Sequence, residues 1–225
     1  MSTNDFLQEL HARIAAHDLL CHPFYQAWSA GELTREDLHE YAQQYFAHVE
    51  AFPAYLSAFA GRLAPGTVRE AVLANMKDEL GESPRSHAEI WLDFAEGMGG
   101  NREGAPQVAK EMSELVAAFQ NVAENGTPAE ALAAFYAYES QVPRIAKTKE
   151  QGLREWYGAD DRTCGYFTLH ATADVHHANV WRSQLTALVT NDAVEQERAL
   201  QAAENASKAL WRALDGMEAA RHTSA

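Results

Sequence analysis

Cysteine is scarce in this chain, and long hydrophobic runs are missing from it. The two cysteines, Cys21 and Cys164, lie far apart and outside any Cys-x-x-Cys spacing, which argues against a thiolate zinc or redox site and favours a reducing, cytoplasmic setting. No run of about 18 apolar residues occurs, so we expect no membrane-spanning helix. The N-terminal residues also lack the pattern of a secretory signal, so we expect none.

Positive charge is also in short supply. Lys and Arg number 18 against 32 Asp and Glu, which gives a formal net charge of −14 at pH 7. Proteins that bind nucleic acid neutralise phosphates with clustered basic side chains, and no such cluster occurs here. The sequence therefore predicts no nucleic-acid partner, and it leaves a homodimer open.

Strand-like alternation is absent, whereas apolar residues recur every three or four positions almost throughout the chain. This pattern predicts an all-α protein, a bundle of about seven helices that forms one domain over residues 1–225. The expected helical segments cover approximately residues 5–18, 23–31, 35–60, 68–98, 102–125, 128–157, 161–189 and 193–221.

Helix breakers lie within three of these segments, and Pro53 is expected to kink the one over 35–60. Gly81 and Pro84 must bend or break the backbone between Glu79 and His87. Pro143 lies inside the segment 128–157, which we nevertheless expect to form one helix.

His170, Asp174 and His177 carry the strongest chemical signal. Their spacing of i, i+4 and i+7 places all three side chains within one stripe of a helix. Imidazole and carboxylate ligands without thiolates suit iron or manganese. The alternative is a polar helix face on which the acid pairs with a histidine.

Glu139 adds a carboxylate on a second helix. It follows Ala-Phe-Tyr-Ala-Tyr, an apolar and aromatic setting in which burying a lone carboxylate is unfavourable. A metal ion would supply the missing partner. Pairing with Arg144, or exposure to solvent beside Pro143, is the competing explanation.

Glu79 and His87 supply a further carboxylate and imidazole. The break at Gly81 and Pro84 can draw them together, although Asp78 or Glu82 could replace Glu79 as the ligand. Acidic residues further along the segment, such as Asp93, are expected to be solvated charges on a helix face.

Three carboxylates and three histidines can hold two divalent metal ions and leave positions open for dioxygen. Both an Fe/Fe and a Mn/Fe pair suit this ligand set. The predicted metal ligands are Glu79, His87, Glu139, His170, Asp174 and His177.

Several longer motifs resemble one known family. They are the stretches 22–34 (His-Pro-Phe-Tyr-Gln-Ala-Trp-Ser-Ala-Gly-Glu-Leu-Thr), 51–57, 138–146, 166–170 and 173–178. Together they resemble the heme-oxygenase-like diiron oxygenases, in particular the group of CADD, the Chlamydia protein associating with death domains, over about Leu7 to Ala187. The resemblance implies a seven-helix heme-oxygenase-like bundle, and the six predicted ligands fall on the family's metal positions. The stretch between Glu79 and His87 is one residue longer than the family pattern, which leaves the choice among Asp78, Glu79 and Glu82 open.

The resemblance also implies an activity: making para-aminobenzoate for folate synthesis by oxidative excision of a tyrosine side chain of the protein itself. Tyr25 matches the sacrificed tyrosine, and Lys149 matches the internal amino donor. Without the resemblance, Tyr25 reads as a core aromatic and Lys149 as a solvated lysine. Dioxygen is the expected cosubstrate, and the sequence does not identify the external reductant.

Three further tyrosines, Tyr41, Tyr45 and Tyr138, are candidates for redox-active side chains. Tyr41, Tyr45 and His48 share one face of a helix at i, i+4 and i+7, where they can line a cavity or simply pack.

Other functions fit the same scaffold. An oxygenase acting on an external small molecule would use the same pocket. A metal-free enzyme, such as a TenA-type thiaminase or a pyrroloquinoline quinone synthase, has no use for six convergent ligands, and the thiaminase would need Cys21 or Cys164 to face the cavity. A protein that only binds death domains would leave a buried Glu139 unexplained.

Overall fold

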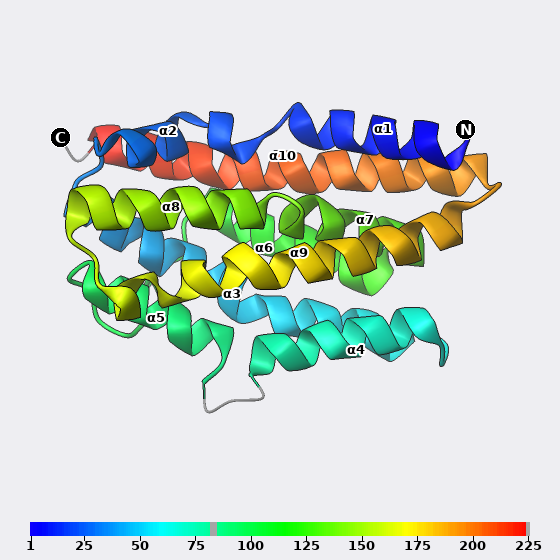
Figure 1. Cartoon of the computed structure of the whole chain (residues 1–225), viewed down its shortest axis with the longest axis horizontal. Coiled ribbons are helices and arrows are strands. Elements are labelled where there is room, and N and C mark those ends of the chain that lie inside the picture. The colour runs from blue at the N-terminus through cyan, green and yellow to red at the C-terminus, as the bar shows by residue number, and fades with distance from the viewer. Residues whose placement is uncertain (82–84, 224–225) are drawn as a thin grey trace.

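The computed structural model describes residues 1–81 and 85–223, and in these ranges the chain forms helices and no strand, as its apolar spacing predicts. The elements, shown in Figure 1, are α1 (Thr3–Ala15), the 3-10 helix η1 (Leu19–Cys21), α2 (Pro23–Ala30), α3 (Arg35–Arg62), α4 (Thr67–Leu80), α5 (His87–Gly97), α6 (Lys110–Asn125), α7 (Pro128–Glu139), α8 (Val142–Tyr157), α9 (Asp161–Val189) and α10 (Ala193–Thr223).

Side chains at the helix starts explain several of these boundaries. Thr34, Ser86 and Thr127 each accept a hydrogen bond from the backbone three residues later, and the acid at that position bonds back to the cap. Ser86 thereby begins α5 at His87, so that this histidine occupies the first helical position.

The expected helix over 128–157 is wrong in one respect, because the structure divides it. The helix α7 ends at Glu139 and α8 begins at Val142. Pro143 lies in the first turn of α8, where a missing backbone N–H leaves no hydrogen bond unmade. The expected break after Glu79 is present, with Gly81 at a φ of 81° closing α4; Glu82 and Pro84 lie outside the described residues.

The helices stack in layers that bury α7. Figure 1 shows α1 lying along α10 on one side of the molecule, α4 on the opposite side, and α9 crossing between them. The helix α10 packs against α7, α6 and α1, and α9 packs against α8, α7 and α5. Nearly every side chain of α7 is buried, which an apolar helix covered on all sides requires. Glu139 ends this most enclosed helix.

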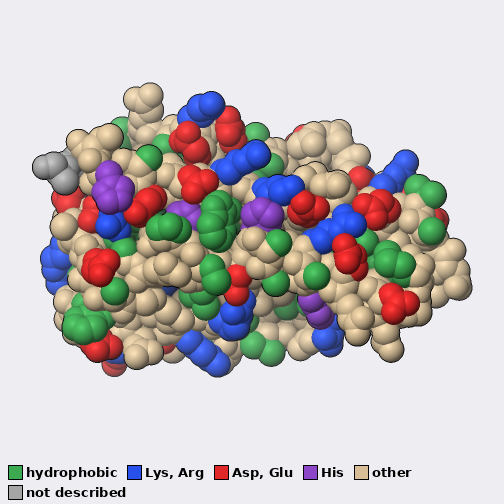
Figure 2. All heavy atoms as spheres, turned by 90° about the horizontal axis from the view of Figure 1, so that it is seen from above, with side chains coloured by type: hydrophobic (Ala, Val, Ile, Leu, Met, Phe, Trp, Pro, Cys, Tyr) green, Lys and Arg blue, Asp and Glu red, His purple; other side chains and the backbone are tan. Residues whose placement is uncertain are grey.

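The surface is strongly mixed in charge. On the face shown in Figure 2, acidic and basic side chains are interspersed. Among the described residues, no helix combines the length and hydropathy needed to cross a membrane.

Candidate metal centre

The helix α9 presents three of the predicted ligands to the interior. His170, Asp174 and His177 are all buried. His170 donates from Nδ1 to the carbonyl oxygen of Tyr166 at 2.8 Å, because a carbonyl can only accept. Its Nε2 therefore keeps a lone pair with which it can bind a metal ion.

The helix α7 contributes Glu139, which is 1% exposed. Its carboxylate accepts a hydrogen bond from Asn75 Nδ2 at 3.1 Å and another from the indole N–H of Trp181. Arg144 bonds Asp18 instead, at 3.2 Å, so the alternative pairing of Glu139 with Arg144 is wrong. Burial, followed by the charge of Asp174, raises the pKa of Glu139 well above its usual value.

The helices α4 and α5 bring Glu79 and His87 together across the break. His87 Nδ1 lies 3.0 Å from Glu79 Oε2, and both residues are buried. Burial alone would raise the pKa of Glu79, but the close contact and charge of His87, together with the charges of His170 and His177, outweigh it, so the pKa is lowered. The ring centroids of His87 and His170 are 4.6 Å apart.

The six side chains converge from four helices. Potential ligand atoms of Glu79, His87 and His170 lie within 4.8 Å of one another, and so do those of Glu79, Glu139 and His177. Glu79 is common to both groups. Asp174 Oδ1 joins the second group at 3.3 Å from His177 Nδ1. The structure thus brings all six predicted residues to one place.

The donor set fits divalent metal ions. His87 Nδ1, His177 Nδ1 and Asp174 Oδ1 are buried and have no hydrogen-bond partner. Two ligands of one ion at about 2.1 Å and at right angles lie about 3.0 Å apart, which matches the 3.0 Å and 3.3 Å contacts among these atoms. A cation between them would satisfy groups that are otherwise unfavourable to bury.

The local electrostatics also favour a cation. Burial alone would lower the pKa of His177, but the close contact with Asp174, the charge of Glu139 and the hydrogen bond with Asp78 raise it to about 9. A divalent ion at this position would replace the proton on the imidazole and neutralise the same carboxylates.

Two small cavities share a wall of tyrosines, formed by Tyr138 and Tyr166. One, of about 10 Å³, has room for about one ion or water. Its lining residues are Val49, Phe52, Glu79, Tyr138, Glu139, Tyr166, His170 and Asp174. The other, of about 30 Å³, is lined by Tyr25, Tyr45 and Lys149 among others. Tyr138 and Tyr166 line both cavities, so they separate the metal side from the tyrosine and lysine side.

Lys149 is buried on the second side of this wall, and its interpretation as a solvated lysine is wrong. Its Nζ donates to the phenolic oxygen of Tyr25 at 2.8 Å and to that of Tyr41 at 2.6 Å. Lys149 lies on α8, and its side chain points into the bundle among aromatic rings. Burial lowers the pKa of Lys149 well below its usual value, which favours the neutral amine.

The tyrosines near Lys149 pack against one another. Tyr25 and Tyr41 share a hydrogen bond of 3.0 Å between their hydroxyls, and Tyr41 stacks on Tyr45 at 5.2 Å between ring centroids. Burial first, and neighbouring tyrosines second, raise the pKa of Tyr25 and Tyr41 well above the usual value. His48 on the same face packs edge-on against Tyr138.

Sequence reasoning missed three residues around the ligands. Tyr166 stacks on His170 with 3.9 Å between ring centroids, and its position one turn before His170 was a usable signal. Asn75 and Trp181 bond Glu139 from other helices, and nothing in their local sequence indicates this.

The expectation that Asp93 is a solvated charge is wrong. Its carboxylate is 2% exposed and pairs with Arg85, Arg102 and Arg162. Three guanidinium groups from outside α5 converge on it, and they fasten α5 to α9 and to the segment after Met98.

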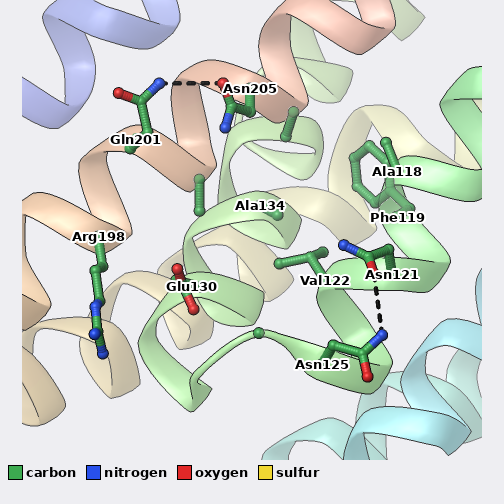
Figure 3. A pocket seen from close by; sticks show the side chains of 13 residues that line it. Ala118, Phe119, Asn121, Val122, Asn125, Glu130, Ala134, Arg198, Gln201 and Asn205 are labelled. Carbon is green, nitrogen blue, oxygen red and sulfur yellow. Dashed lines mark hydrogen bonds between the residues drawn. The ribbon is translucent and has the colours of Figure 1, made fainter.

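The two cysteines and the larger hollow of the molecule lie apart from the predicted site residues. Neither Cys21 nor Cys164 is among the residues that line the two cavities. A larger hollow of about 520 Å³ lies between α6, α7 and α10, and Figure 3 shows its carboxamides paired as Asn121 with Asn125 and Gln201 with Asn205. None of the predicted site residues lines this hollow.

Comparison with known proteins places the chain in a family. The family described as iron-containing redox enzymes matches residues 39–211. The 4-aminobenzoate synthase of Nitrosomonas europaea is 37% identical over 230 residues, which covers 96% of this chain and 92% of that protein. The 4-aminobenzoate synthase of Chlamydia trachomatis serovar D is 36% identical over 214 residues, which covers 94% and 91%. This chain belongs to the iron-containing redox enzymes.

The fold of this iron-containing redox enzyme is heme-oxygenase-like. A solved domain with a heme oxygenase-like fold from Shewanella denitrificans matches it with a TM-score of 0.82 at 16% identity, covering 99% of this chain and 94% of that one. The predicted fold class is therefore confirmed. Family membership makes the chain an enzyme with a metal centre.

Proposed function

We propose that this chain makes para-aminobenzoate from one of its own tyrosines, in an oxygen-dependent reaction at a dinuclear metal centre. The names of the relatives support the product, and the family supports the metal. The proposed ligands are Glu79, His87, Glu139, His170, Asp174 and His177, whose geometry supports two Fe ions or a Mn/Fe pair. When bound, the metals supply the activation of dioxygen, with electrons from an external reductant.

Tyr25 is the proposed source of the carbon atoms. Para-aminobenzoate contains a six-membered ring, one carbon opposite the nitrogen, and an amino group. A tyrosine ring with its Cβ supplies all seven carbons: the Cα–Cβ bond breaks, and dioxygen oxidises Cβ to the carboxyl group. Nitrogen replaces the phenolic oxygen, which leaves as water, and the Nζ–Cε bond of the donor amine breaks to free the product. Tyr25 is enclosed and lines the same cavity as Tyr138 and Tyr166.

Lys149 is the proposed nitrogen donor, and its contact with Tyr25 is the observation that carries the proposal. Nζ lies 2.8 Å from the Tyr25 hydroxyl and 4.2 Å from the centre of its ring. A neutral amine, which burial favours, has the lone pair needed to bond a ring carbon. The Tyr41 hydroxyl accepts a hydrogen bond from the same amine and holds it in place.

Tyr41, Tyr45 and Tyr138 are proposed as redox-active side chains between the two cavities. Tyr138 borders both cavities, Tyr45 borders the one that contains Lys149, and Tyr41 stacks on Tyr45. These rings offer a short path by which an electron can leave Tyr25 for the metal side.

Isotope labelling tests the self-sacrifice directly. Protein containing ring- and Cβ-labelled tyrosine and ¹⁵N-labelled lysine should release labelled para-aminobenzoate, at most one per chain, after loading with iron or with manganese and iron. Tyr25→Phe should release none. Tyr136→Phe is the matched control, because Tyr136 is also buried but contacts His11, outside both cavities.

The alternative is an external small-molecule substrate in the same pocket. Repeated turnover by Tyr25→Phe protein, with unlabelled product, would refute self-sacrifice and favour that alternative. The metal assignment is tested separately: His170→Ala should lose metal loading while its helical circular dichroism is retained, because the apolar core supplies most of the stability.

A further inference from the structure

We propose that Asp78 is a positioning residue of the metal centre, which holds the outer nitrogen of His177 so that this imidazole binds metal through Nδ1. The inference rests on the dinuclear centre proposed above and adds a residue to it. It also answers which of the neighbouring acids, Asp78 or Glu79, acts as the ligand.

The contact between α4 and α9 fixes the His177 ring. Asp78 Oδ2 lies 3.1 Å from His177 Nε2, and a carboxylate oxygen can only accept, so Nε2 carries the hydrogen. Only Nδ1 then remains for a metal. Nδ1 is buried without a hydrogen-bond partner and lies 3.3 Å from Asp174 Oδ1, one of the proposed ligands.

His170 shows the opposite arrangement on the same helix. Its Nδ1 is held by the backbone carbonyl of Tyr166, one turn earlier, so Nε2 is left for the centre. The Asp78 carboxylate, on a neighbouring helix, accepts a hydrogen bond from the outer nitrogen of His177, just as the backbone carbonyl of Tyr166 accepts one from His170. Such partners fix the ring orientation and raise the basicity of the coordinating nitrogen.

Exposure separates the roles of the two acids. The Asp78 side chain is 52% exposed, whereas that of Glu79 is 7% exposed. Consecutive residues on a helix point about 100° apart, so only one of them can face the interior. Glu79 belongs to both convergent groups of ligand atoms, and Asp78 to neither.

Asp78 instead stands at an opening to solvent. Together with His177 and Asn75 it lines a hollow of about 290 Å³ between α4 and α9. Asn75 and His177 form its inner side, next to Glu139. Asp78 therefore acts on the metal only through His177.

Metal-binding measurements on three variants test this role. Asp78→Ala removes the acceptor, Asp78→Asn keeps an oxygen that accepts from Nε2–H, and Glu70→Ala removes an exposed acid that lines the same hollow. Mn²⁺ affinity is measured by competition with a chelator, and metal content at saturation by elemental analysis, with circular dichroism to verify folding.

We expect Asp78→Ala to weaken Mn²⁺ binding at one of the two ions by about 10- to 100-fold, a range typical of lost outer partners, and still to bind two ions at saturation. Asp78→Asn should recover most of the affinity, and Glu70→Ala should match the wild type. Loss of one ion at saturation in Asp78→Ala would make Asp78 a direct ligand, and unchanged affinity would remove its positioning role. Wild-type protein that binds fewer than two ions would instead refute the proposed dinuclear centre.

Nitrogen NMR gives a second readout. In protein containing ¹⁵N-labelled histidine and loaded with diamagnetic Zn²⁺, His177 should be metal-bound at Nδ1 and protonated at Nε2, and His170 the reverse. His177 bound through Nε2 would overturn the inference, whatever the activity of the enzyme.

Discussion

Lys149 donates a hydrogen bond from Nζ to the phenolic oxygen of Tyr25 over 2.8 Å, although 124 residues separate them in the chain. Tyr25 stands on the short helix α2 and Lys149 on α8, and these two helices pack against each other. The amine also lies over the rings of Tyr25 and Tyr41. Both of these hydrogen bonds from the buried amine go to phenolic oxygens, and neither goes to a carboxylate.

Replacing Lys149 with Met should therefore separate stability from activity. Methionine has a similar length and is apolar, so the thermal midpoint should stay the same or rise. Tyr25 and Tyr41 keep their mutual hydrogen bond of 3.0 Å. Release of para-aminobenzoate, followed by mass spectrometry, should stop. Lys147→Met, at an exposed position of the same helix, is the control and should release product normally. Normal release from Lys149→Met would exclude Lys149 as the nitrogen donor.

Trp181→Phe should weaken metal binding by about 10- to 100-fold, because it removes the indole N–H that bonds Glu139. The measurement is metal content after dialysis against a chelator of known affinity. Trp91→Phe is matched to it, since Trp91 is equally buried and its N–H bonds the carbonyl of Ala42 at 2.7 Å rather than a metal ligand. The prediction fails if both variants retain the same amount of metal.

Asp93→Asn should lower stability above about pH 4 but much less near pH 2. Burial would raise the pKa of Asp93, but hydrogen bonds from Arg85 and Arg102 lower it to about 2, from 3.8. A carboxylate whose folded pKa is depressed contributes stability above its unfolded pKa and loses it as the pH falls through the folded one. A shift of this size corresponds to about 2 kcal/mol. Urea unfolding of the metal-free proteins at pH 5 and pH 2.5 measures this, and a constant difference between wild type and variant would contradict it.

His22 should make the docking of α2 sensitive to acid. Its Nδ1 accepts the Phe24 N–H at 3.1 Å, and its Nε2 is 3.1 Å from Asp215 on α10. Burial lowers the pKa of His22, although Asp215 and Glu218 oppose this. The neutral ring makes both contacts, so stability is present above the unfolded pKa of about 6.5 and falls as the pH drops below it.

The His22→Asn variant tests this pH dependence, because asparagine keeps a capping acceptor and does not titrate. The free energy of unfolding of wild-type protein should fall more than that of the variant between pH 8 and pH 5. Parallel pH profiles for the two proteins would show that His22 does not titrate on unfolding.

Periodicity made the local part of the site predictable. The spacing of His170, Asp174 and His177 determines their common face on any α-helix, whatever surrounds it. The break between Glu79 and His87 followed from the residues between them, and the aromatic setting of Glu139 indicated a buried carboxylate. These features depend on neighbours within about two turns, which the sequence displays directly.

Burial by distant helices could not be predicted in the same way. Asp93 and Lys149 read as solvated charges because their own segments resemble exposed helix faces, yet α9 and α2 respectively help to enclose them. Lys149 also lies on α8, the second of the two helices into which 128–157 divides.

The sequence by itself determined that the chain is helical, where most helices begin, and that His170, Asp174 and His177 share one face of a helix. Tertiary structure alone decided that Lys149 meets Tyr25, that Asp78 lies outside the centre while Glu79 lies within it, and which nitrogen of His177 faces inward. The reason is physical: a helix face is set by residues a few positions apart, whereas desolvation and hydrogen-bond partners depend on which other helices pack against that face.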